Sequence, residues 1–174
     1  LSAVYQLQPF DRVLKNEYLL GIRYNHRLSG HTKMGIYYYD EKSENWIYVD
    51  TKNNDDKNIL TGNLDQFHAV TIIQDLVPPK ILNTYPANGG FYDGQDVKKI
   101  IIDVEDSISG IEPKEKSFII KLNGNRLFCA YQPVKKQITY EFERGMKEGD
   151  HLIDIIVKDK VGNKTNKSIS FTCK

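Results

Sequence analysis

The stretch VKDKVGN, residues 157–163, closes an apolar run that begins at His151. Here a strand-like sequence runs into an acid, two variable residues, a glycine and an asparagine. Asp159 can accept hydrogen bonds from backbone N–H groups two or three residues further on. Gly162 can adopt a positive φ, and Asn163 tolerates the left-handed region while bonding its own backbone. The stretch therefore predicts a chain reversal that leads into a last strand.

A second stretch, VEDSISGI (104–111), follows the same plan about fifty residues earlier. An apolar strand runs into Asp106, and Ser109 and Gly110 follow. We expect Asp106 and Gly110 to be structural turn residues, as Asp159, Gly162 and Asn163 are in the first stretch. Ile111 would then return to the core.

Apolar and polar residues alternate over short runs along most of the chain, whereas helical stripes of ten or more residues are hard to find. This pattern predicts an all-β protein. In the second half we expect strands near 81–85, 97–104, 117–122, 126–132, 137–143, 151–158 and 166–172. In the first half we expect them near 4–8, 17–25, 34–40, 45–51, 58–64 and 67–74, with a turn of helix inside DKNILTGNLDQF. Seven short strands separated by turn signals favour an immunoglobulin-like or fibronectin III-like β-sandwich for the second half.

The Asn-Gly pair in LNGNR (122–126) predicts a two-residue hairpin, because both central residues of a type I′ turn need a positive φ. Between the two halves, Pro78 and Pro79 cannot donate ladder hydrogen bonds and favour an extended path. We therefore expect two tandem β-sandwich domains, residues 1–76 and 81–174, joined by a proline linker at 77–80.

Charge and composition restrict the partners. Lys and Arg total 24 and Asp and Glu total 23, so the chain carries no global field that would attract nucleic acid. No run approaches the roughly 18 apolar residues of a membrane span, so we expect no membrane insertion. The first residues, LSAVYQLQPF, include neither an initiator Met nor a signal peptide, and we expect the chain to be part of a longer protein.

The second half resembles the Ig-like modules of secreted bacterial proteins. The resemblance covers residues 75–172 and rests on IIIDVEDSISGI (100–111) and KEGDHLIDIIVKDKVGN (147–163). In that family an Asp-x-x-Ser-Gly-Ile turn follows the second strand and an Asp-x-x-Gly-Asn turn follows the sixth. The first half, with GIYYYD (35–40) and WIYVDT (46–51), looks like the β-rich companion that often precedes such a module.

This pairing is similar to regions that lie C-terminal to the catalytic domain of some secreted M23-type zinc peptidases, and to parts of other bacterial surface proteins. The zinc ligands of those peptidases, a His-x-x-x-Asp and a His-x-His, are not in this sequence. The resemblance therefore implies a non-catalytic, extracytoplasmic accessory module. Its expected partners are neighbouring domains of the parent protein, and cell-wall polysaccharide or surface proteins. Neither G-x-S-x-G nor a P-loop is present, so we expect no enzyme and no cofactor.

Two sets of polar residues have an alternative reading as metal ligands. Asp103, Asp106 and Asp159 could gather at one end of the sandwich and bind Ca²⁺, which takes six to eight oxygen ligands. The spacing does not fit an EF-hand, and alternation places Asp103 on the opposite face from Asp106, so turn capping is favoured. His26 and His31 lie five residues apart in NHRLSGH, but zinc would need at least one more ligand, and solvated histidines are favoured.

Aromatic residues concentrate in MGIYYYDEKSENWIYVD (34–50), which predicts a hairpin of two strands. Alternation places Tyr37 and Tyr39 on one face, and Trp46 and Tyr48 fall together across the hairpin. These four side chains could form an exposed platform for sugar rings, which gives the alternative function of a glycan-binding module. Cross-strand aromatic pairs also stabilise hairpins without any ligand, and this simpler reading is favoured.

The two cysteines, Cys129 and Cys173, lie in strand-like runs and lack the spacing of a metal or redox site. Free thiols are favoured. A disulfide that ties the last strand to its neighbour is the alternative, because the pairing depends on a Cα separation that the sequence does not give.

Overall fold

The computed structural model describes residues 3–8, 13–25 and 31–174. It is an all-β protein in which the described helical segments are short 3-10 turns. The chain forms two compact units, Leu1–Val77 and Pro78–Lys174, and the division falls within the predicted linker at 77–80. Each unit has its own hydrophobic core.

The first unit is a sandwich of two antiparallel sheets. Its strands are β1 (Tyr5–Gln6), β2 (Val13–Arg23), β3 (Met34–Asp40), β4 (Asn45–Tyr48), β5 (Thr51–Asn54), β6 (Ile59–Gln66) and β7 (Ala69–Gln74). One sheet has the order β1-β7-β3-β4 and the other the order β2-β6-β5. Alternation along β6 buries Leu60 and Leu64, and these pack with Ile36 of β3 and Val70 of β7 in the core.

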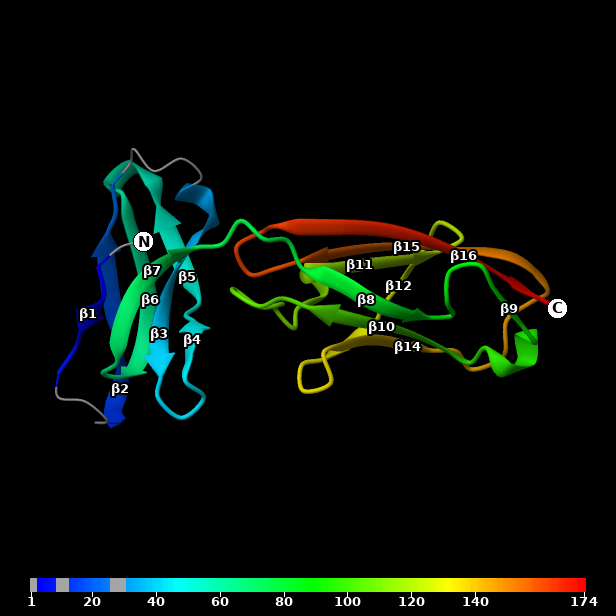
Figure 1. Cartoon of the computed structure of the whole chain (residues 1–174), viewed down its shortest axis with the longest axis horizontal. Coiled ribbons are helices and arrows are strands. Elements are labelled where there is room, and N and C mark those ends of the chain that lie inside the picture. Colours follow the sequence, from blue (N-terminus) through cyan, green and yellow to red (C-terminus); the bar gives the residue numbers. More distant parts are fainter. Residues whose placement is uncertain (1–2, 9–12, 26–30) are drawn as a thin grey trace. The chain divides into compact units, whose positions relative to one another are not determined.

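The second unit is also a sandwich of two sheets (Figure 1). Its strands are β8 (Lys80–Tyr85), β9 (Gly90–Tyr92), β10 (Lys99–Glu105), β11 (Phe118–Leu122), β12 (Asn125–Leu127), β13 (Ala130–Gln132), β14 (Gln137–Glu141), β15 (Gly149–Lys158) and β16 (Lys164–Cys173). The sheet orders are β13-β14-β10-β8 and β12-β11-β15-β16-β9. They correspond to strands D-E-B-A and C′-C-F-G of an immunoglobulin fold, with β9 added parallel to the last strand. The predicted fold class is confirmed.

The stretch quoted first, residues 157–163, joins β15 to β16, which are the long orange and red strands of Figure 1. The two strands pair over ten positions, from Gly149 opposite Cys173 to Lys158 opposite Lys164. Alternation along β15 buries His151, Ile153, Ile155 and Val157, and leaves the intervening side chains on the outer face. These residues form the core together with those of β10.

The predicted Asn-Gly turn is present between β11 and β12. Leu122 pairs with Asn125, so Asn123 and Gly124 are the two loop residues. Their φ angles are 49° and 82°, as a type I′ turn requires.

Two predicted strands are divided in the structure. The run 126–132 splits because β12 pairs with β11 in one sheet whereas β13 pairs with β14 in the other, so the chain changes sheets at Phe128. The run 45–51 ends at Tyr48, and β5 starts at Thr51 and pairs with β6 in the opposite sheet. A turn of helix was expected inside DKNILTGNLDQF, but most of that stretch is β6, and only its first two residues belong to a 3-10 turn at Asp55–Lys57.

Candidate functional site

Asp106 caps the turn that follows β10. Its Oδ1 accepts hydrogen bonds from the backbone N–H of Ile108 at 3.2 Å and of Gly110 at 2.5 Å. Gly110 has a φ of 77°, a conformation that residues with a side chain rarely adopt. The carboxylate and the glycine together reverse the chain, and Ile111 then enters the core with 7% of its surface exposed.

Asp159 holds the turn between β15 and β16. Its Oδ1 accepts the backbone N–H of Asn163 and its Oδ2 accepts the side-chain amide of Asn163, each at 2.7 Å. Asp159 therefore accepts from a residue four positions further along the chain, whereas the sequence analysis predicted two or three. Gly162 takes the left-handed conformation, with a φ of 85°, and the side-chain amide of Asn163 donates to Asp159.

The two turns are joined to each other. Ile111 and Asp159 form an isolated antiparallel bridge, and the N–H of Lys160 donates to the carbonyl of Gly110 at 3.0 Å. The sequence analysis treated the two stretches as separate reversals. In the folded unit they form one hydrogen-bonded layer.

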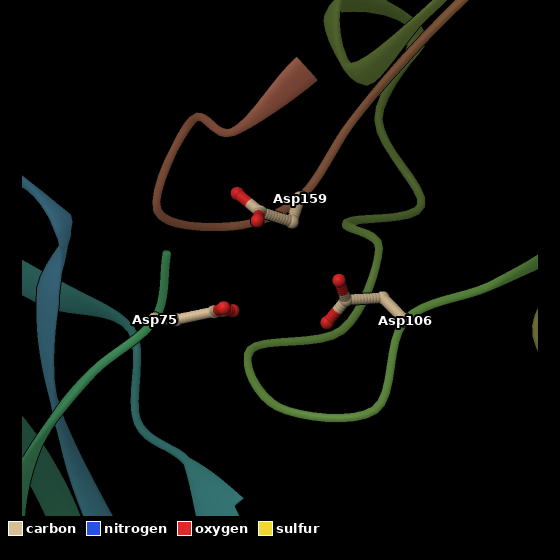
Figure 2. A group of neighbouring side chains, drawn as sticks. All are labelled: Asp75, Asp106 and Asp159. Carbon is tan, nitrogen blue, oxygen red and sulfur yellow. The ribbon is translucent and has the colours of Figure 1, made fainter. Parts of the chain in front are cut away.

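Figure 2 shows the carboxylates of Asp106 and Asp159 at this layer. In the first unit, Asp75 follows β7 and accepts a local hydrogen bond from the N–H of Val77 at 3.0 Å. The sequence analysis missed Asp75 as a turn residue, although it ends an apolar strand as Asp106 and Asp159 do.

Asp103, the third predicted calcium ligand, does not belong to this layer. Its side chain is on the outer face of β10, where it accepts from Gln137 at 2.9 Å and from Asn83 at 3.3 Å. The strand period is the reason, since the buried Ile102 and Val104 that flank Asp103 face the core.

The aromatic hairpin places its four candidate residues in two cross-strand pairs. Tyr37 pairs with Tyr48 and Tyr39 with Trp46, with ring centroids 5.4 Å and 5.3 Å apart. Tyr37 is 0% exposed, so it does not contribute to an exposed ligand surface. Tyr48 covers Gly35, where a Cβ atom would lie 2.5 Å from its ring. Tyr39 and Trp46 are partly exposed and are the pair that a ligand could reach.

The histidines of the described segments have different surroundings. His151 is 8% exposed, its Nε2 lies 2.8 Å from the carbonyl of Lys147, and its Nδ1 lies 3.1 Å from the amide of Asn123. Because the carbonyl accepts and the amide donates, this ring is held in one orientation as a structural residue. His31 begins a 3-10 turn at His31–Lys33, and His26 lies outside the described residues.

Both cysteines are free thiols in the second unit. Burial raises the pKa of Cys129 to about 12, and burial also raises the pKa of Cys173. Neither thiol therefore has the lowered pKa that a nucleophilic cysteine needs.

No helix in the described segments is both long and apolar enough to span a membrane. A comparison with known protein families found no match, and a search of curated protein sequences found none either.

Similar solved structures exist at low sequence identity. CopC from Methylosinus trichosporium OB3b is 15% identical over 55% of this chain and 93% of its own, with a TM-score of 0.45. PcoC, a methionine-rich copper resistance protein from Escherichia coli, is 13% identical over 56% of this chain and 100% of its own, with a TM-score of 0.45. Domains A168–A170 of titin are 10% identical over 98% of this chain and 65% of their own, with a TM-score of 0.38. A likeness at this level of sequence identity does not identify a function.

Proposed function

We propose that the chain is a non-catalytic accessory module of a larger secreted or cell-surface bacterial protein, in which it spaces or docks a neighbouring domain near cell-wall or matrix polymer. The observation that carries this proposal is the use of the acidic residues at the ends of β10 and β15. Asp106 and Asp159 hold two turns of the second unit through hydrogen bonds to backbone N–H groups. Polar side chains that serve the fold in this way support a structural role.

The neighbouring domain that we propose is a peptidase of the M23 type. This part rests on the resemblance of residues 75–172 to Ig-like modules, and on the β-rich unit that precedes them. A module of this kind would act outside the cytoplasm. Zinc chemistry would then belong to the neighbouring domain, and this chain would set that domain's distance from the polymer.

A glycan-binding module is the second candidate, and one observation favours it. Tyr39 and Trp46 form a partly exposed aromatic pair, and aromatic faces can stack on sugar rings. The two candidates share a location near polysaccharide. They differ in whether a sugar contacts the β3–β4 hairpin.

A sedimentation assay with purified peptidoglycan tests the proposal. We expect the chain to be retained with the polymer and to release no soluble fragments, with or without added Zn²⁺. Release of fragments in proportion to the amount of chain would contradict a non-catalytic role. Retention that disappears in Trp46→Ala, while Phe128→Ala behaves as the wild type, would instead favour the glycan-binding candidate; Phe128 is the matched control because it is an exposed aromatic residue of the other unit.

A further inference from the structure

A cavity of about 410 Å³ lies in the first unit, where β3, β6 and β7 come together at one end of the sandwich. Its lining is polar and aromatic. Tyr38 and His68 supply a pair of rings, Tyr39 is a further lining residue, and Asp65 is the acid that β6 contributes. The cavity does not include Asp106 or Asp159, and a ligand bound in it would be additional to the accessory role proposed above.

The aromatic side of the cavity is built from stacked rings. Tyr38 and His68 lie face to face, with centroids 4.4 Å apart and planes 29° apart. Tyr39 is held by its contact with Trp46, so its position is fixed by the cross-strand pair. Flat, partly exposed rings of this kind attract planar and cationic groups.

The remaining lining residues make the cavity acidic. Asp40, Glu41 and Asp65 each bring a carboxylate, and Lys42 brings an ammonium group, so the lining carries a net charge of about −2 if His68 is neutral. Asp40 accepts hydrogen bonds from the hydroxyl of Ser43 at 2.6 Å and from its N–H at 3.2 Å. These bonds lower the pKa of Asp40 and keep it ionised at neutral pH.

Two of these carboxylates lie near the aromatic side. The pKa of Tyr38 is raised, first by burial and then by the charges of Asp40 and Asp65. A cation at the Tyr38–His68 pair would therefore lie within the field of both acids.

We propose that this cavity binds a guanidinium group, as carried by an arginine side chain of a partner polypeptide. A guanidinium is planar, so it can stack on the Tyr38–His68 ring pair while its N–H groups donate to Asp40 and Asp65. A lysine ammonium matches the charge and lacks the plane. A neutral sugar can stack on the rings and does not complement the charge.

Trp46 is the only tryptophan of the chain and contacts the lining residue Tyr39, so we choose its fluorescence as the readout. We would titrate the whole chain, at low ionic strength, with a short peptide that contains one arginine. Matched peptides would carry lysine or citrulline at that position, and glucosamine and N-acetylglucosamine would represent polysaccharide. The arginine peptide is expected to bind with a Kd on the order of millimolar, because partly exposed ion pairs and cation–π contacts are individually weak.

Asp65→Asn is expected to weaken binding of the arginine peptide by roughly 3- to 10-fold. The control is Asp56→Asn, which removes the same charge from an exposed 3-10 turn outside the cavity lining. Thermal melting followed through Trp46 would confirm that both variants fold. Selectivity for arginine over citrulline, lost in Asp65→Asn and kept in Asp56→Asn, would support the proposal. Equal binding of the citrulline peptide, tighter binding of either sugar, or no saturable change would overturn it.

Discussion

Ile102→Ala is expected to lower the free energy of unfolding of the second unit by about 3 kcal/mol and to leave the first unit unchanged. Ile102 is 0% exposed and pairs with Ile138, which is also 0% exposed. Removal of its side-chain atoms would leave a cavity in the packed layer between the two sheets. Each unit has its own core, so the loss should not pass to the first unit.

The chain carries a separate probe in each unit. Trp46 lies in the first unit, and the only two cysteines, Cys129 and Cys173, lie in the second. Both thiols have a raised pKa in the folded unit, so near pH 8 a thiol reagent should react rapidly only after unfolding. Urea unfolding of one sample can therefore be followed by fluorescence and by thiol exposure.

In Ile102→Ala the midpoint of thiol exposure should fall by about 2 M urea, and the Trp46 midpoint should stay where it is. Leu60→Ala, at a fully buried position of the first unit, should give the opposite result. Leu152→Ala is the control for the second unit because Leu152 is 44% exposed on β15. If both probes shifted together in Ile102→Ala, the two units would not unfold independently and the tandem-domain description would be wrong.

Asp159→Ala is expected to lower the stability of the second unit by about 2 kcal/mol. Asp159 is 4% exposed, and the change removes two hydrogen bonds from Asn163 to the Asp159 carboxyl group. It also leaves the backbone N–H of Asn163 without its acceptor. Asp159→Asn should lower the stability by less than Asp159→Ala, because its amide oxygen can still accept the backbone N–H of Asn163. It should still lower the stability, because its amide nitrogen cannot accept the side-chain amide of Asn163.

The matched control for this prediction is Asp154→Ala, which removes a carboxylate that accepts the hydroxyl of Ser168 on the outer face of β15 and β16. Its effect should stay within about 0.5 kcal/mol. The measurement is the urea midpoint of thiol exposure for all three variants. A rise in stability in Asp159→Ala would contradict the capping role, because it would mean that repulsion between Asp159 and the nearby Asp106 outweighs the hydrogen bonds that Asp159 accepts.

Local signals in the sequence predicted much of the fold. The buried faces of β10 and β15 follow from the alternation of apolar and polar residues, and the turn at Asn123 and Gly124 follows from two residue types that tolerate a positive φ. The sequence could not show that one strand-like run changes sheets at Phe128. Nor could it predict β9, whose three residues depend on pairing with β16, a strand some eighty residues later.

The candidate site was predictable only in part, for the same reason. Asp106 and Asp159 could be identified from the turns that they begin. That Asp103 would instead accept hydrogen bonds from Gln137 and Asn83 depends on how distant strands pair. The burial of Tyr37 likewise depends on what covers the outer face of β3, and the residues of its own strand do not reveal it.

The most direct test of the account is the size and upstream sequence of the native polypeptide that contains these 174 residues. Intact mass and N-terminal sequencing of the protein from its source would measure both. We predict a longer polypeptide with an export signal and at least one further domain, and a His-x-x-x-Asp with a His-x-His upstream would identify that domain as a zinc peptidase. A native polypeptide that consists of these residues alone, recovered from the cytoplasm, would contradict the account.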